Sequence, residues 1–402
     1  MRKGWYKSLL RWQLVFTILF SVLILIFQHD LLNLIYIVLL LVSFFLMYKN
    51  RDKASHIFNI IVLPYVLIEI YSEFLKLLIK LFAGFEIGFY ILYLIGMLVL
   101  LVPVTIRDYS SLKRPIWQLL ASVWVIVNLF LSPLVTVNSG QFIVGLNNSG
   151  LLLALMFFEY AYFAITGWGY KFYFNLKVKN TNTLYYIMLL VLLAVTVWIS
   201  FFNIFILSAS EWSQALWNWD FSLINPVDSV TVKNIWQLIF SALDAGIMEE
   251  SARYIFLLAP LVMLANKKGQ VIYSILLSSG IFSLLHIFNF STPGATINTV
   301  LFQVFHAFGF GCLLGTIFLY SGKLWLPMLL HAFADFLSLS LVPLGYGGSL
   351  LDNENTGALT LVVVTVIPLI FVTIILLNKS AKRYIDKNIK KYIEIQYLSD
   401  KE

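Results

Sequence analysis

The dominant pattern along this chain is a series of long apolar runs separated by short polar loops. An α-helix needs about 20 apolar residues to cross the hydrocarbon core of a membrane. Lipid offers no hydrogen-bond partners, and a helix satisfies the backbone N–H and C=O groups of such a run within the run itself. We therefore predict an all-α protein, a polytopic transmembrane helical bundle of about twelve spans. The spans are expected near residues 12–28, 31–48, 56–75, 86–106, 116–137, 149–170, 184–207, 234–265, 270–289, 296–320, 324–341 and 358–377.

Basic residues gather in alternate loops of this predicted bundle. They include Lys49, Lys53, Arg107, Lys113, Lys171, Lys177, Lys267, Lys268 and Lys323, followed by a basic C-terminal tail. The intervening loops are neutral or acidic, as at Glu211 and Asp220. Because cytoplasmic loops carry the excess of Lys and Arg, both termini are predicted to be cytoplasmic.

The composition is typical of a membrane protein, and this affects how the net charge is interpreted. The 402 residues are 60% hydrophobic and 12% charged, with a mean hydropathy of +0.89. The net charge of +7 comes from basic loops, so it indicates topology rather than nucleic-acid binding. The single cysteine, Cys312, excludes an intramolecular disulfide. The first apolar run resembles a signal peptide but lacks an A-x-A-like cleavage site, so a retained span is predicted.

Three regions are expected. Residues 1–183 form an N-terminal membrane region of about six spans, which could bind a partner membrane protein, and residues 184–377 form a membrane core. Residues 378–402 form a basic cytoplasmic tail in which Lys and Arg alternate with Tyr and Ile. This tail is either an amphipathic helix on an anionic leaflet or a solvated segment ordered only by nearby lipid.

Polar clusters interrupt the apolar runs in the second half of the chain. They are Glu249-Glu250 with Arg253, then His286, and then His331 with Asp335. An ionisable side chain at the centre of a membrane helix costs roughly 2.5–3.5 kcal/mol, so several of them are expected to face one another. Carboxylates and imidazoles together are the groups of proton-transfer chemistry, which makes these clusters the candidate functional site.

The first two clusters also have structural interpretations. Glu249 and Glu250 point about 100° apart on a helix, so one can work while the other pairs with Arg253, three or four residues further on. Alternatively, the three residues form a buried ion pair that fastens the helix to its neighbours. His286 shares a helix face with Phe282 and could be a packing residue.

His331 and Asp335 lie four residues apart and share a helix face. A carboxylate that accepts from a ring N–H fixes a histidine tautomer, so Asp335 is expected to orient His331. Counted along the spans, Glu249 and His286 lie at similar depth, roughly 24 Å from the cytoplasmic end, and His331 lies shallower. His306 has no polar partner at helical spacing and is expected to be structural.

A metal site is a further alternative. The chain has no H-E-x-x-H sequence, so the familiar helical zinc-protease arrangement is absent. Glu249, His286 and His331 could still bind zinc with an open coordination position. Nothing in the spacing requires a metal, so no cofactor is predicted.

The order of these residues resembles the CPBP family, which comprises CAAX proteases and bacteriocin-processing enzymes and is also called Abi. Its pattern is Glu-Glu with a following Arg, then Phe-x-x-x-His, then His-x-x-x-Asn or Asp. The matching segments here are Glu249-Glu250-Ser251-Ala252-Arg253, Phe282-Ser-Leu-Leu-His286 and His331-Ala-Phe-Ala-Asp335. The run GCLLGTIFLYSGKLWLPMLLHAFADF is also similar, and the resemblance covers about residues 185–345.

The resemblance implies peptide hydrolysis without a covalent enzyme intermediate. Glu249, helped by His286, would take a proton from the water that attacks the scissile carbonyl. His331, with Asp335, would stabilise the resulting oxyanion. Asp335 stands where the family often has Asn, and an ionised Asp cannot donate to an oxyanion. It must therefore be protonated or must serve to orient His331.

The remaining residues of the motifs have supporting roles in this scheme. Glu250 and Arg253 are expected to hold the helix of Glu249 in register, with Phe282 beside them. Arg253 follows the pair one residue earlier than is usual in the family. Glu249 is assigned as the base because Met248 would otherwise take that place.

Three functions are compatible with the sequence. The first is an intramembrane endopeptidase of a bacterial cytoplasmic membrane, acting on peptide or membrane-protein substrates and linked to bacteriocin maturation or self-immunity. The second is a non-catalytic membrane scaffold or immunity protein with the same core. The third is a twelve-span transporter, although transporters usually have two related halves and the polar clusters here lie only in the second.

Overall fold

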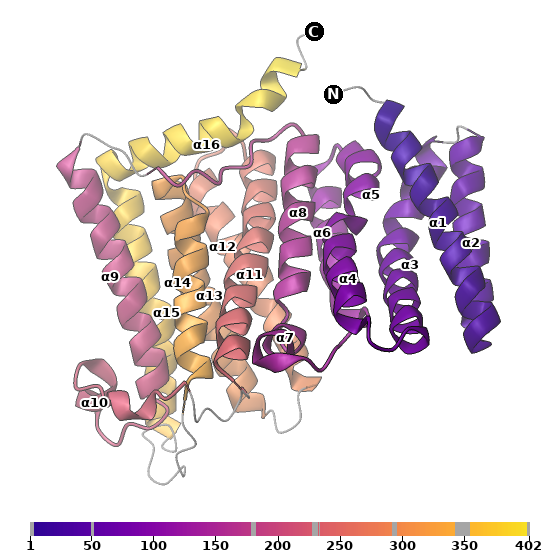
Figure 1. The fold of residues 1–402 in the computed structure, drawn as a ribbon. Coiled ribbons are helices and arrows are strands. Elements are labelled where there is room, and N and C mark those ends of the chain that lie inside the picture. The colour runs from indigo at the N-terminus through magenta and orange to yellow at the C-terminus, as the bar shows by residue number, and fades with distance from the viewer. Residues whose placement is uncertain are drawn as a thin grey trace. The chain divides into compact units, whose positions relative to one another are not determined.

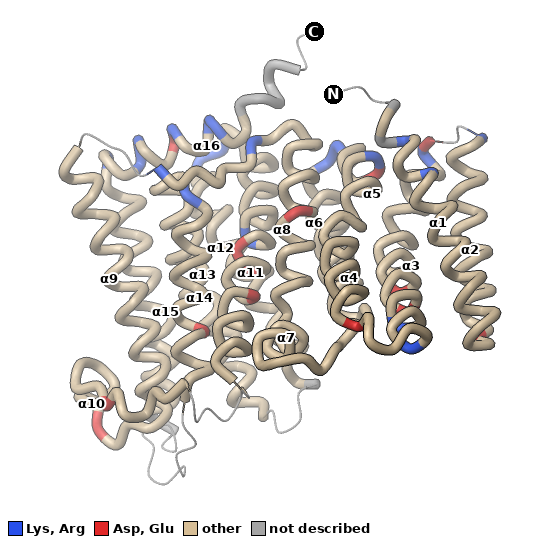
Figure 2. The backbone as a smooth tube through the Cα atoms, in the orientation of Figure 1, with Lys and Arg blue, Asp and Glu red and all other residues tan. Residues whose placement is uncertain are grey.

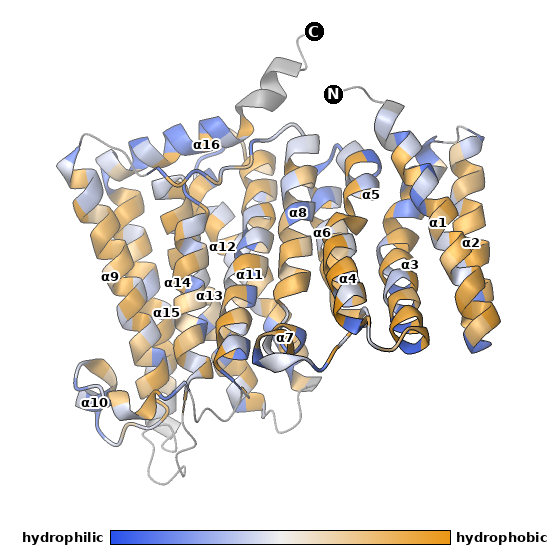
Figure 3. Ribbon diagram, viewed as in Figure 1, coloured by the Kyte–Doolittle hydropathy of each residue, from blue (hydrophilic) through white to orange (hydrophobic). Residues whose placement is uncertain are grey.

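The computed structural model describes residues 4–49, 52–177, 182–226, 232, 234–291, 296–341 and 354–399. These residues form helices and turns without a β-strand, which confirms the predicted all-α class. They divide into two compact units, residues 1–170 and residues 171–402. Figure 1 shows long helices running side by side within each unit, and Figure 3 shows hydrophobic residues covering most of their length.

The helices of the first unit are α1 (Gly4–Gln28), α2 (Leu32–Tyr48), α3 (Asp52–Leu81), α4 (Glu86–Leu100), α5 (Val102–Arg107), η1 (Tyr109–Ser111), α6 (Pro115–Leu131), α7 (Gly140–Asn147) and α8 (Leu151–Gly167). A buried polar cluster joins α3 to the end of α5. The carboxylate of Asp108 lies 2.6 Å from His56 Nδ1 and accepts from Asn59 Nδ2 at 3.1 Å. Since these polar groups satisfy one another, the cluster holds the helices together.

The helices of the second unit are α9 (Thr183–Phe205), α10 (Trp212–Leu216), η2 (Phe221–Leu223), α11 (Ile235–Met263), α12 (Gln270–Leu285), η3 (His286–Ser291), α13 (Ile297–Ser321), α14 (Trp325–Leu339), α15 (Glu354–Leu377) and α16 (Lys379–Ser399). Within this unit α13 packs against α12, α15 and α16, and α11 packs against α12 and α14. These contacts bring the three polar clusters of the sequence into one unit.

Local sequence explains where the site helices begin and end. Asn234 caps α11, because its side-chain oxygen accepts from the Gln237 N–H at 2.9 Å. Pro260 lies in the last turn of α11. Gly322 ends α13 in the left-handed conformation, with φ +69°. Pro327 lies in the first turn of α14, where its missing N–H breaks no helical hydrogen bond.

Each of the twelve predicted spans coincides with a helix or an adjoining pair of helices. Seven helical segments of the described chain are long and apolar enough to cross a membrane, and the bent pair α7 and α8 would make an eighth. The other predicted spans correspond to the shorter apolar helices α2, α6 and α14 and to α11. The chain is thus a multi-pass membrane protein. The count of twelve and the cytoplasmic termini stay predictions.

Candidate active site

The candidate site lies where α11 packs against α14. Gly246 makes the close approach possible, since a Cβ atom at this position would lie 2.4 Å from the main-chain oxygen of Met328. About one turn further along each helix, Glu249 and Glu250 of α11 meet His331 of α14. Figure 2 shows acidic positions part-way along α11, with a basic position beside them.

His331 bridges the two glutamates through its two ring nitrogens. Nδ1 lies 2.7 Å from Glu250 Oε1, and Nε2 lies 3.2 Å from Glu249 Oε2. The histidine side chain is 9% exposed. These contacts join residues about 80 positions apart in the chain, and they exist only because α11 and α14 pack together.

Glu250 is the paired member of the two glutamates. Arg253 Nε donates to both carboxylate oxygens of Glu250 at 3.0 Å, and both side chains are buried. The guanidinium carbon also lies 4.1 Å from the centre of the Phe282 ring, a cation–π contact. The prediction that one of the two glutamates pairs with Arg253 is confirmed, and the role of the other stays a prediction.

Glu249 is the available member. Its side chain is 32% exposed, against 1% for Glu250. Its Oε2 atom is within ion-pair distance of His331, but the alignment is not that of a hydrogen bond, and the described residues give this oxygen no other partner. This oxygen is itself buried, so a water or a substrate group that reached it would satisfy an unpaired acceptor.

Asp335 occupies a different position from the one expected. Its Oδ2 lies 4.0 Å from His331 Nε2, and Glu250 makes the orienting contact to Nδ1 that was predicted for Asp335. The nearer carboxylate thus comes from the neighbouring helix α11 and not from α14 itself. Asp335 also interacts electrostatically with Asp244 of α11.

The predicted depth of His331 was wrong. Counting residues from the loop placed it shallower than Glu249, yet the two side chains are in contact. The count fails because the turn before α14 lies beneath α16 rather than at the surface. Leu324 in this turn is buried, and Asn388 of α16 donates to the main-chain oxygen of Leu319 at 2.9 Å.

His286 lies at the edge of the cluster. It follows directly after α12, and its Nδ1 is 3.4 Å from the main-chain oxygen of Phe282. Its ring meets the Phe282 ring edge-on, with 5.1 Å between centroids. Within the described residues no hydrogen bond or ion pair joins His286 to Glu249, although His286 and His331 interact electrostatically. The expected direct help from His286 to Glu249 stays a prediction.

Residues of α13 complete the surroundings of the site. His306 stacks between Phe302 and Phe310, in agreement with the structural role expected for it. Phe310 in turn meets His331 edge-on at 5.6 Å, a contact that sequence reasoning missed. Gly311 passes close to Arg253, because a Cβ there would lie 2.4 Å from Nη1. Gly311 begins the run GCLLGTIFLYSGKLWLPMLLHAFADF that resembles the family, and this was the sequence signal that α13 belongs to the site.

The predicted alternative metal set does not converge in this structure. Among the residues that the structure describes, no group of three or more His, Cys, Asp and Glu side chains is arranged to hold a metal ion. Glu249 and His331 are adjacent, whereas His286 contacts the main-chain oxygen of Phe282 on α12.

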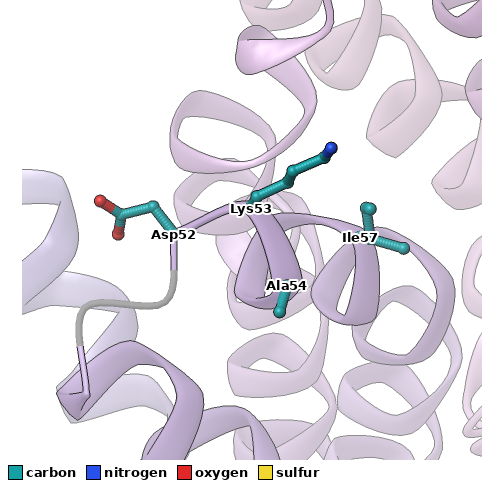
Figure 4. A pocket seen from close by; sticks show the side chains of 4 residues that line it. All are labelled: Asp52, Lys53, Ala54 and Ile57. Atoms are coloured by element: carbon teal, nitrogen blue, oxygen red, sulfur yellow. The ribbon is translucent and has the colours of Figure 1, made fainter.

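A separate depression lies in the first unit, at the start of α3. It has a volume of about 500 Å³ and is lined by Asp52, Lys53, Ala54 and Ile57 (Figure 4). Only short parts of one helix line it, and none of the predicted site residues does. We assign it no role.

Comparison with known proteins finds a family match in the part of the chain that contains the candidate site. A family model described as type II CAAX prenyl endopeptidase Rce1-like matches residues 231–337. This match contains Glu249, Glu250, Arg253, Phe282, His286, His331 and Asp335. No curated protein and no solved structure matches the chain. Residues 231–337 are thus an Rce1-like segment, which confirms the predicted resemblance and is consistent with an intramembrane protease of the CPBP family.

Proposed function

We propose that this protein is an intramembrane endopeptidase that hydrolyses peptide bonds with a water activated by Glu249. The observation that carries the proposal is the position of His331 between Glu249 and Glu250, inside the Rce1-like segment. A carboxylate beside an imidazole is a pair that can take up and return one proton. The proposed substrates are peptides or membrane proteins, and a role in bacteriocin maturation or self-immunity is the setting that the resemblance suggests.

The first step of the proposed reaction uses the orientation of His331. The Glu250 carboxylate is held by Arg253 and accepts from His331 Nδ1–H, so Nε2 is directed toward Glu249. Glu249 takes a proton from water, and the water oxygen forms a bond to the scissile carbonyl carbon. The carbonyl π electrons move to the oxygen, and a tetrahedral oxyanion results.

The second step breaks the peptide bond. The oxyanion re-forms the carbonyl, the C–N bond breaks, and the proton held at Glu249 passes to the leaving amine. When His331 carries a proton on Nε2 as well, that N–H can stabilise the oxyanion, and the nearby carboxylate of Asp335 favours this charged form. His286 is proposed to contact the water or the substrate from the end of α12.

The test compares membrane proteomes from cells that carry equal amounts of wild-type protein or of the Glu249→Gln variant. New peptide termini are mapped in each sample. We expect a set of termini that is present with the wild type and absent with Glu249→Gln. The matched control is Glu73→Gln, which changes a partly exposed glutamate on α3 that pairs with Lys76. Identical termini in all three samples, with any biological phenotype preserved, would favour the non-catalytic scaffold.

A further inference from the structure

The C-terminal helix α16 is a docked part of the second unit. Its side chains at Ala381, Ile385, Ile389 and Tyr392 are buried. These positions follow helical spacing and form one face, so the amphipathic tail that the sequence suggested covers its apolar face with protein. Figure 1 shows α16 lying across the ends of the neighbouring long helices, and it contacts α9, α11, α13 and α15.

Specific contacts fix this position. The Tyr392 ring stacks on Phe318 of α13, with 5.2 Å between centroids and an angle of 3° between the planes. It also lies 5.9 Å from Tyr254, the residue that follows Arg253 on α11. Asn388 Nδ2 donates to the main-chain oxygen of Tyr320 at 3.0 Å. The helix therefore rests on α11, which carries the Glu250–Arg253 pair, and on α13, which passes close to Arg253 at Gly311.

The opposite face of α16 is exposed and basic. Its exposed ionisable residues up to position 393 are Lys379, Lys382, Arg383, Asp386, Lys387 and Lys390, which is five basic residues against one acidic residue. Figure 2 shows these basic positions along the helix. Such a strip attracts anionic groups within about one Debye length, roughly 10 Å at 0.1 M salt.

The strip begins where a lipid-facing surface ends. Among the candidate spans α15 is one of the least covered by protein, with 28% of its apolar window buried. Its last residue, Leu377, is 78% exposed, and Lys379 begins α16 two residues later. A side chain that follows an exposed apolar helix this closely lies at the level of the lipid headgroups.

We propose that the basic face of α16, formed by Lys379, Lys382, Arg383, Lys387 and Lys390, binds the headgroups of anionic phospholipids and that this binding keeps α16 docked on α11 and α13. Charge and position support the lipid as the partner, because the strip adjoins the lipid-facing end of α15. Since the apolar face is already covered by protein, the attraction is electrostatic and does not require insertion of α16 into the bilayer.

The test measures amide hydrogen exchange in α16 for the full-length protein in nanodiscs of phosphatidylcholine alone or with added phosphatidylglycerol. We expect phosphatidylglycerol to slow the exchange of α16 by about fivefold or more, the contribution of a single Lys or Arg at an anionic surface. High salt should remove this difference. The triple variant Lys382→Glu/Arg383→Glu/Lys387→Glu should exchange equally in both membranes. The neutral triple Lys382→Gln/Arg383→Gln/Lys387→Gln serves the same purpose if charge reversal lowers the yield.

The control variant Lys53→Glu/Lys113→Glu/Arg114→Glu makes the same change of charge at exposed positions of the first unit. It should keep the response of α16 to phosphatidylglycerol. Equal exchange of wild-type α16 in the two membranes would overturn the proposal and leave an acidic soluble partner as the better occupant. A response that the control loses as well would also overturn it, because the effect would then follow total charge. None of these readouts depends on proteolysis.

Discussion

Gly246 on α11 faces the main-chain oxygen of Met328 on α14 so closely that a methyl group would lie 2.4 Å from it. This approach allows Glu249 and Glu250 to reach His331 one turn away. A backbone oxygen cannot move aside as a flexible side chain can, so a larger residue at position 246 must separate the two helices.

We therefore expect Gly246→Ala to lower the free energy of unfolding by about 1–3 kcal/mol and to reduce cleavage. The matched control is Gly280→Ala on α12, where a Cβ would meet nothing within 4 Å. Thermal unfolding in detergent, together with the terminus mapping, measures both effects. Equal behaviour of the two variants would show that the close approach does not determine the geometry of the site.

Two variants distinguish a structural role of the Glu250–Arg253 pair, in stability, from a role in positioning His331. Glu250→Gln leaves a buried arginine without its carboxylate, a change that costs about 3–5 kcal/mol. The double variant Glu250→Gln/Arg253→Met removes both charges and should recover most of that stability. Cleavage should stay low in the double variant, because His331 Nδ1 no longer faces a carboxylate. Recovery of cleavage together with stability would assign the pair a purely structural role.

A pair of glycines on α13 tests whether the Arg253 guanidinium must stay in place. A Cβ at Gly311 would lie 2.4 Å from Arg253 Nη1, whereas a Cβ at Gly315 would meet nothing within 4 Å. Gly311→Ala should displace the guanidinium and lower the rate of cleavage, and Gly315→Ala should leave the rate unchanged. The measurement is the rate at equal amounts of folded protein. A normal rate for Gly311→Ala would mean that Arg253 tolerates a shift without loss of function.

The docking of α16 makes a prediction about stability. Asn388→Leu removes donors to the main-chain oxygens of Leu319 and Tyr320 and should cost about 1–3 kcal/mol. Asp386→Leu, two residues away on the exposed face, should change stability little. Limited proteolysis of α16 at increasing temperature compares the two variants. Earlier cleavage of the Asp386 variant would contradict the docked arrangement.

Sequence reasoning worked where the relevant interaction is local. Apolar runs predicted the positions of the helices, and the spacing of three residues predicted that Arg253 can pair with Glu250. Adjacent residues on a helix point in different directions, which predicted that only one of the two glutamates pairs with Arg253. The choice of Glu249 as the base came from the resemblance.

Sequence reasoning failed where contacts depend on how helices pack. The contact between His331 and Glu250 joins distant parts of the chain, and a pattern within one helix favoured Asp335 as the partner instead. The depth of His331 depends on a turn that α16 covers, which a count of residues from a loop cannot include. The edge-on contact of Phe310 was missed for the same reason, since any aromatic residue in an apolar run looks like core.

The most direct test of the central proposal is the cleavage rate of purified full-length protein in liposomes, with a substrate found by terminus mapping. The account expects Glu249→Gln to lower this rate by at least about 100-fold, the contribution of a general base, while the thermal unfolding temperature stays that of the wild type. A folded Glu249→Gln protein that cleaves at the wild-type rate would contradict the assignment of Glu249 as the group that activates water.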